Sequence, residues 1–430
     1  MTLGVAIFCV VIVVYAAFAA KLDRWSITAP MVFVAAGFLL GTGGTSLLGI
    51  SPRVEGVKEL TEITLALLLF ADASTLSLKL VSDDANLPLR LLTIGLILTI
   101  AFGTVVALGL LPGEGLAFAA LLGAILAPTD AALGLPIFNN PRVPVRIRRA
   151  LNVESGLNDG IATPFVALFL AFAVATEAQS QSGAWLTTAL AEIGIAVVVG
   201  AAVGAIGGWL LTQAARRGWT TAHTEQIAVL GLGLAAYFGS LAIHGNGFIA
   251  AFVGGIVFRA ITKNHLAEAT EFTENVGTFL SVLVWGIFGA VLLPLALQYT
   301  TNWRPLIYAI LSLTLIRMAP VALALRGAGL RRDTVGLMGW FGPRGLASVV
   351  FTLMAFLEFA DAGRPIDTLV AVAGWTILLS VVAHGLSAVP LSGWYARRLA
   401  AATEPPVELA DMDELRGRRG LLSDPHGQRS

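Results

Sequence analysis

Residues 153–160 read VESGLNDG and place several side chains that can hold a cation or a proton inside an apolar stretch. Ser155 and Asp159 are four positions apart and share a helix face, while Glu154 and Asn158 share the adjacent face. A carboxylate flanked by hydroxyl and carbonyl oxygens suits a hard cation such as Na⁺, and the same carboxylate binds protons. The spacing therefore indicates a site where cation and proton compete for the same oxygen atoms.

Further charged side chains lie within apolar stretches, where each costs at least about 2.5–3.5 kcal/mol and so needs a partner or a function. The acids are Asp72, Asp130, Glu154 and Asp159, and the bases are Arg317 and Arg344. Arg317 is expected to pair with Glu154, because no acid lies in its own helix. Arg344 is expected to offset either Asp130 or carbonyl groups exposed by a helix break. With four acids and two bases, at least one acid can hold a proton or an exchangeable ion.

Each of these residues also has a purely structural interpretation. Asp159, Asp130 and Asp72 would then be satisfied acids, and Asn158 would be an interhelical hydrogen bonder. The pair of Glu154 with an arginine is interpreted as structural and not as part of transport. His244 and the loop histidines have no assigned role.

The composition sets the class of protein. The chain has 430 residues, is 57% hydrophobic and only 13% charged, with zero formal net charge. Its mean hydropathy is +0.83, far above that of soluble domains. A nucleic-acid partner is not expected. The single cysteine, Cys9, excludes an intrachain disulfide and a cysteine metal cluster.

Thirteen apolar stretches are long enough, or nearly so, to span a bilayer. The first is not a secretory signal, because no basic residue precedes it. The predicted fold is therefore an all-α integral membrane protein. The stretches are 3–20, 26–48, 58–78, 88–111, 115–137, 146–175, 184–213, 223–244, 247–262, 273–297, 304–325, 334–358 and 367–399.

Two of these stretches contain proline beside a charged residue near their centre: APTDAA in the fifth and FGPRG in the twelfth. Proline lacks a backbone donor and clashes with the preceding turn, so both helices should break within the membrane. Matching breaks predict two inverted six-helix repeats, about 1–175 and 223–402, joined by a linking helix at 184–213. Secondary transporters build a midplane site from discontinuous helices in this way.

The distribution of Lys and Arg predicts the orientation of a transmembrane domain at 1–402. Seventeen of these residues lie in the loops on one side and in the stretch that follows the last helix, against four on the other side. The positive-inside rule then places the N-terminus outside and the C-terminus in the cytoplasm, in an inner or plasma membrane. Residues 403–430 are polar and are predicted to form a short disordered cytoplasmic tail.

The motifs APTDAA, ESGLNDG and GPRG, in this order, resemble those of the sodium/proton exchanger family. The resemblance covers roughly residues 5–400 and is to the NhaP-like bacterial members of the cation:proton antiporter-1 branch. It implies thirteen helices, with the two broken helices crossing each other, and a homodimer in the lipid bilayer. It implies no cofactor. A regulatory partner is not expected, because the chain stops soon after the last helix.

The resemblance also assigns roles to residues. Asp159 resembles the acid that binds cation and proton alternately, and Asp159, Thr129 and Ser155 would coordinate Na⁺. Asp130 and Asn158 resemble neighbours in the site. Asp72, in a loose version of a third-helix acidic motif, is an additional candidate ligand. Glu154 resembles the acid paired with arginine, here Arg317.

The sequence is compatible with three classes of function. The leading hypothesis is an antiporter that exchanges Na⁺, or alternatively Li⁺ or K⁺, for protons by alternating access. Members with an Asn-Asp pair resemble electroneutral one-for-one exchangers, since only one titrating charge belongs to the site. The alternative is a cation channel or uniporter of similar fold. An intramembrane enzyme is disfavoured, because HExxH, GxSxG and GxGD motifs are absent from the sequence.

Overall fold

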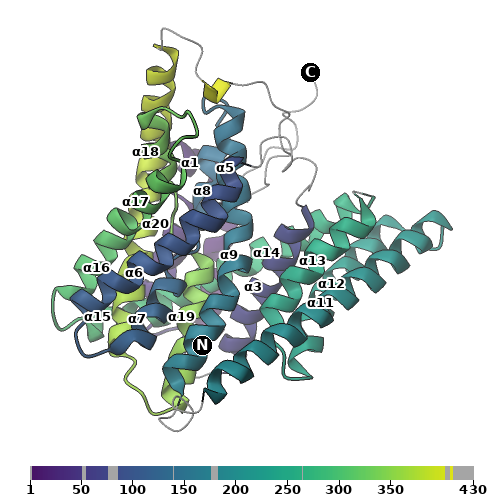
Figure 1. Ribbon diagram of the computed structural model, residues 1–430, viewed down its shortest axis with the longest axis horizontal. Helices are drawn as coiled ribbons and strands as arrows, with labels where there is room; N and C mark the ends of the chain where they lie inside the picture. Colours follow the sequence, from purple (N-terminus) through teal and green to yellow (C-terminus); the bar gives the residue numbers. More distant parts are fainter. Residues whose placement is uncertain are drawn as a thin grey trace.

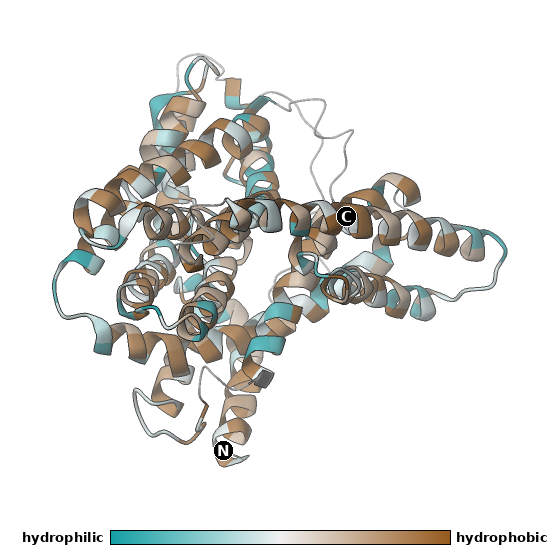
Figure 2. Cartoon of the chain, turned by 60° about the horizontal axis from the view of Figure 1, so that its bottom comes forward, coloured by the Kyte–Doolittle hydropathy of each residue, from teal (hydrophilic) through white to brown (hydrophobic). Residues whose placement is uncertain are grey.

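The computed structural model of the protein describes residues 2–50, 55–75, 86–138, 140–175, 183–263, 265–401 and 407–409. In these residues the regular structure is helical, with no strand. Seven of the described helical stretches are long and apolar enough to cross a membrane, and shorter apolar helices accompany them. Apolar residues run along the helices and polar residues gather in loops and at helix ends (Figure 2). The predicted all-α membrane fold is confirmed.

The first six predicted spans all appear as helices in the described residues. Residues 76–78, the end of the third predicted span, lie outside them. The helices are α1 (Thr2–Arg24), α2 (Ala29–Leu40), α3 (Glu55–Thr75), α5 (Asn86–Arg90) continuing into α6 (Leu96–Leu110), α7 (Gly115–Ile125) with α8 (Ala131–Phe138), and α9 (Val145–Val174).

The remaining predicted spans also coincide with helices in the described residues. They are α11 (Ala184–Arg216), α12 (Ala222–Leu241), α13 (Gly247–Thr262), α14 (Ala267–Ile287) continuing into α15 (Leu293–Tyr299), α16 (Arg304–Leu313) with α17 (Leu315–Ala324), α18 (Arg332–Trp340) with α19 (Leu346–Asp361), and α20 (Asp367–Ala400). The division of the chain into two inverted repeats stays a prediction.

Both predicted breaks are present. The fifth span is non-helical at residues 126–130, between α7 and α8, and the twelfth at 341–345, between α18 and α19. Pro128 and Pro343 lie in these breaks, where neither can donate a backbone hydrogen bond. The two breaks also touch, because the Asp130 amide donates to the Pro343 carbonyl at 2.7 Å. The broken helices therefore cross at their non-helical segments, as the resemblance implied.

Three irregularities were not predicted from the sequence. Leu91–Gly95 and Phe288–Leu292 form π-helical turns inside the fourth and tenth spans. The second of these precedes Pro294, whose missing amide favours such an irregular turn. The eleventh span is kinked at Thr314, which has φ −110° and ψ −93°.

The helices form two groups, with α9 between them. In Figure 1, α3 and α11–α14 lie together at the right, and α6, α7 and α15–α18 lie at the left with α20. Helix α9 packs against α7, α8 and α19 and also against α3, α11 and α13. The helix that carries VESGLNDG therefore contacts both groups.

Close packing of α11 on α13 depends on two glycines. A Cβ atom at Gly200 or Gly204 would collide with the carbonyl oxygen of Ala250 or Gly254. The Gly200–Gly204 spacing is the small-xxx-small pattern that lets membrane helices approach closely. It fixes the packing within one helix group.

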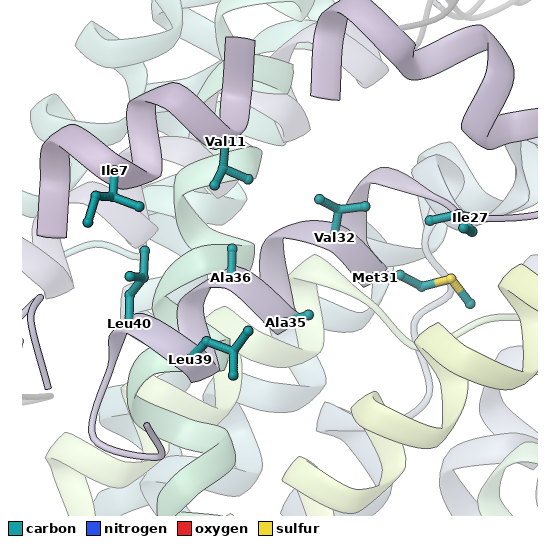
Figure 3. Close-up of a pocket in the computed structure, with 9 residues that line it drawn as sticks. All are labelled: Ile7, Val11, Ile27, Met31, Val32, Ala35, Ala36, Leu39 and Leu40. Carbon is teal, nitrogen blue, oxygen red and sulfur yellow. The ribbon is translucent and has the colours of Figure 1, made fainter. Parts of the chain in front are cut away.

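An apolar groove of about 510 Å³ lies between α1 and α2 (Figure 3). Its lining contains no charged or hydrogen-bonding side chain, so it does not take part in ion chemistry. The lining residues are Ile7, Val11, Ile27, Met31, Val32, Ala35, Ala36, Leu39 and Leu40.

The prediction of a disordered tail is wrong at one place. Val407–Leu409 form a short 3₁₀ turn, and the Glu408 side chain is buried. The reason is that Glu408 accepts two hydrogen bonds from the chain near the start of α18. The rest of the predicted tail, 403–406 and 410–430, lies outside the described residues.

Candidate functional site

Asp130 joins the two broken helices. Its Oδ1 accepts a hydrogen bond from the Leu133 amide at 3.0 Å, in the first turn of α8. Its Oδ2 accepts one from the Leu346 amide at 2.7 Å, at the start of α19. Helix N-termini carry partial positive charge and unpaired amides, so one carboxylate stabilises both half-helices. This geometry gives Asp130 a structural contact at each break, and its place among the ion ligands stays a prediction.

Arg344 serves the opposite ends of the breaks. Its side chain is fully buried, and Nη1 donates to the carbonyl oxygens of Ala127 at 2.6 Å and Pro128 at 3.3 Å. Nη2 donates to the Ser312 carbonyl at 3.4 Å. The carbonyl end of α7 carries partial negative charge, which the guanidinium offsets. Of the two predicted targets, Asp130 or exposed carbonyl groups, these contacts match the carbonyl groups.

The two glycines of GPRG make room for charged side chains. A Cβ atom at Gly342 would collide with the Arg317 guanidinium, and one at Gly345 would collide with the Asp130 carboxylate. The proline of the motif also makes a contact, because the Pro343 carbonyl oxygen accepts the hydrogen bond from the Asp130 amide. The motif lets two charged groups approach the backbone of the break.

Glu154 and Arg317 form the predicted ion pair. Arg317 Nη1 lies 2.6 Å from Glu154 Oε1, and both side chains are only 2% exposed. Glu154 comes from α9 and Arg317 from α17, so the pair links the helix of VESGLNDG to the kinked eleventh span. Buried charges require partners of this kind.

Three buried polar side chains meet between α9 and the break of the fifth span. Thr129 Oγ1 lies 3.2 Å from Ser155 Oγ, and Asn158 Nδ2 donates a hydrogen bond to Thr129 Oγ1. All three are 1–2% exposed. Thr129 comes from the break between α7 and α8, and the other two come from α9. The structure therefore brings the predicted neighbours together from segments about thirty residues apart.

Asp159 directly follows Asn158 on α9 and lies one helical turn beyond Ser155. It is partly buried, and its backbone carbonyl accepts a hydrogen bond from Thr163. A carboxylate, two hydroxyls and an amide oxygen are hard ligands of the type that alkali cations prefer. We call Thr129, Ser155, Asn158 and Asp159 the polar cluster.

Asp72 lies on α3, a helix that packs against α9, and its side chain is partly buried. Its membership of the polar cluster stays a prediction. The described residues contain no group of three or more His, Cys, Asp or Glu side chains that could hold a metal ion.

Sequence reasoning missed a buried network on α20. Ser380 Oγ accepts a hydrogen bond from the Arg344 amide at 2.6 Å and lies 3.2 Å from His384 Nδ1. His384 Nε2 lies 2.8 Å from the Trp340 carbonyl oxygen, at the end of α18. The available signal was a histidine in the middle of an apolar span, where polar side chains require partners.

Residues 7–394 match the sequence profile of a family described as "Sodium/hydrogen exchanger, transmembrane". The chain belongs to the sodium/hydrogen exchanger family. The predicted resemblance is thereby confirmed over nearly the whole chain.

Named relatives of this exchanger include antiporters for both sodium and potassium. The Na(+)/H(+) antiporter NhaH of Halobacillus dabanensis is 27% identical over 294 residues, which cover 64% of this chain and 68% of NhaH. The Na(+)/H(+) antiporter NhaP of Pseudomonas aeruginosa is 26% identical over 284 residues, covering 63% and 64%. The K(+)/H(+) antiporter NhaP2 of Shewanella sp. strain ANA-3 is 24% identical over 300 residues, covering 67% and 48%. The matches thus span about half to two thirds of these relatives.

The exchanger is also similar in fold to a solved structure. That of the sodium proton antiporter MjNhaP1 from Methanocaldococcus jannaschii at pH 8 gives a TM-score of 0.70 with 20% identity. The match covers 89% of this chain and 99% of MjNhaP1. The likeness establishes an NhaP-type helical membrane fold.

Proposed function

We propose that the protein is a secondary antiporter that exchanges a monovalent cation for a proton across the membrane. Family membership supports this activity, and the polar cluster carries it. The cluster is built where a broken helix meets the helix of VESGLNDG, the kind of place at which transporters bind ions.

The make-up of the polar cluster points to Asp159 as the exchanging acid, because Asp159 is the carboxylate among its four members. Glu154 in its pair with Arg317 and Asp130 at two helix N-termini also have contacts that hold the fold together. Asp159 directly follows Asn158 on α9 and lies one helical turn beyond Ser155, which places it at the buried oxygens of the cluster in our proposal. Binding of a cation to these oxygens and protonation of the carboxylate exclude each other.

The stoichiometry follows from the amide at position 158. Because Asn158 cannot ionise, the polar cluster carries one titrating carboxylate, Asp159. One bound cation or one bound proton then gives the same net charge, so exchange is one for one and electroneutral. The cation is Na⁺ in our proposal, with Li⁺ and K⁺ as alternatives, since named relatives transport sodium or potassium.

Alternating access follows from the position of α9. This helix contacts both helix groups, so a movement of one group against the other exposes the polar cluster to opposite membrane faces in turn. We place the N-terminus outside and the C-terminus in the cytoplasm, as the basic residues indicate. A homodimer in the inner or plasma membrane completes the proposal.

Proteoliposomes that hold the full chain and a pH-sensitive dye test the function. We expect Na⁺, Li⁺ or K⁺ to dissipate an imposed pH gradient. In the Na⁺ and Li⁺ assays the rate of dissipation should not change when valinomycin and K⁺ clamp the membrane potential, because the exchange is electroneutral. Asp159→Asn should abolish this signal, because its amide cannot release a proton. Cation flux without proton movement would instead support a channel or uniporter, and undiminished exchange by Asp159→Asn would refute the assignment.

A further inference from the structure

A carboxylate from the C-terminal tail is buried against the membrane domain. Glu408, in the short turn Val407–Leu409, is 1% exposed, although its two neighbours are 50% and 56% exposed. In Figure 1 this turn is the short yellow segment at the upper end of α9. Burial of a single acid between exposed apolar neighbours indicates a specific contact and not hydrophobic collapse.

Glu408 caps the N-terminus of α18. Its Oε1 accepts hydrogen bonds from the Arg331 amide at 2.9 Å and from Thr334 Oγ1 at 2.7 Å. Arg331 is the N-cap residue of α18, and its own side chain makes no capping hydrogen bond. A distant residue therefore supplies the negative charge and the acceptor that a helix N-terminus favours.

The capped helix leads directly into the broken segment. Helix α18 has only nine residues, and a helix of this length depends on tertiary contacts for its stability. Its far end is held by His384, at the Trp340 carbonyl, and the break that follows positions Arg344 and receives Asp130. Displacement of α18 would therefore also displace the contacts of Arg344 and Asp130, which hold the two broken helices together.

The same turn also contacts α9, and the α18 residue that it binds contacts α20. Arg146 Nη1, in the first turn of α9, donates to the Val407 carbonyl at 3.1 Å. Tyr395 of α20 shares a hydrogen bond with Thr334, at 3.0 Å between their oxygens. The tail turn thus joins the ends of α9 and α18, and Thr334 links α18 to α20. Helix α9 carries three residues of the polar cluster.

We propose that Glu408 is a positioning residue for cation exchange: by capping α18 from the tail, it fixes the broken twelfth span relative to α9 and so pre-organises the cation site. The proposal rests on the proposed exchange function. Glu408 acts through α18 and does not touch the transported ion. When the cap is lost, α18 occupies its ordered position for a smaller fraction of the time, and the apparent cation affinity falls by that fraction.

The test compares full-length variants reconstituted at equal amounts of folded protein. Glu408→Ala is expected to raise the cation KM about fivefold, while the maximal rate stays within about twofold of the unsubstituted protein. Glu408→Gln should give a smaller rise, because its amide oxygen can still accept both hydrogen bonds but carries no charge. Leu409→Ala, in the same turn with a 56% exposed side chain, is the matched control and should leave KM unchanged.

A double-mutant cycle with Thr334→Val checks the contact itself. If Glu408 acts through α18, the two substitutions together should raise KM by less than the product of their separate effects. An unchanged KM in Glu408→Ala, with only a lower yield or melting temperature, would overturn the positioning role. Multiplicative effects in the cycle would do the same. Absence of exchange by the unsubstituted protein would instead refute the proposed function.

Discussion

At the scale of single residues, VESGLNDG combines two kinds of acid on adjacent helix faces. Glu154 is held by Arg317 in a buried ion pair, whereas Asp159 directly follows Asn158 and lies one helical turn beyond Ser155. The first arrangement stabilises the fold, and the second suits reversible binding of an ion. Substitutions at the ion pair of Glu154 should therefore change stability, whereas substitutions in the polar cluster should change cation affinity.

Loss of the buried ion pair should destabilise the protein. Glu154→Gln leaves the Arg317 guanidinium buried without its counter-charge, which costs about 3–5 kcal/mol. A lower unfolding temperature in detergent checks this, and adding Arg317→Met should recover part of the loss. Asp333→Asn is the control, because the Arg331–Asp333 pair is about one third exposed and should contribute only about 0–1 kcal/mol. Equal losses for both single substitutions would contradict the structural role of Glu154.

The Thr129 hydroxyl should contribute to cation affinity. Thr129→Val keeps the side-chain shape but removes the oxygen shared with Ser155 and Asn158, so we expect a rise in the cation KM of about tenfold, equivalent to about 1.4 kcal/mol. Thr129→Ser retains the hydroxyl and should stay near the original KM. Initial exchange rates at a series of Na⁺ concentrations measure both. If Thr129→Val and Thr129→Ser had the same cation KM, the Thr129 hydroxyl would not contribute to cation binding.

At the scale of elements, the crossing of two broken helices depends on close approach as well as on charge. Asp130 reaches the start of α19 only because position 345 lacks a side chain. Glycine here is required by contact, whereas one glycine of the same span faces open space. Gly336 in α18 is such a position.

Gly345→Ala should therefore disrupt the crossing. The added methyl group would overlap the Asp130 carboxylate, so we expect loss of exchange and a lower yield of folded protein. Gly336→Ala is the matched control, because nothing lies near its Cβ position and alanine favours helix by up to about 1 kcal/mol. Size-exclusion profiles and exchange rates compare the two. Normal activity of Gly345→Ala would show that the crossing tolerates a wider separation.

At the scale of the whole molecule, competition at one carboxylate links the cation dependence to pH. Below the pH at which half the sites are protonated, each further unit of acidification should raise the apparent cation KM about tenfold, because protons occupy the site first. The maximal rate at saturating cation should change much less. Exchange rates measured over a grid of pH and Na⁺ concentration check this. A KM independent of pH would exclude a shared site.

The sequence by itself determined the class of fold, the positions of the spans and the two breaks. These are local properties, because apolar length sets a membrane helix and proline interrupts it. It also singled out Glu154, Asp159 and both intramembrane arginines, since a charge within an apolar stretch is conspicuous without any contact being known.

Only the tertiary structure decided which partner each charge has. Asp130 meets the amides of two half-helices, Arg344 meets carbonyl groups of a helix more than two hundred residues away, and Glu408 leaves a polar tail to cap α18. The kink at Thr314 was likewise invisible in the sequence, and so were the partners of His384. The reason is that hydrogen bonds between distant segments depend on how the helices pack. Hydropathy and proline positions, in contrast, can be read directly from the sequence.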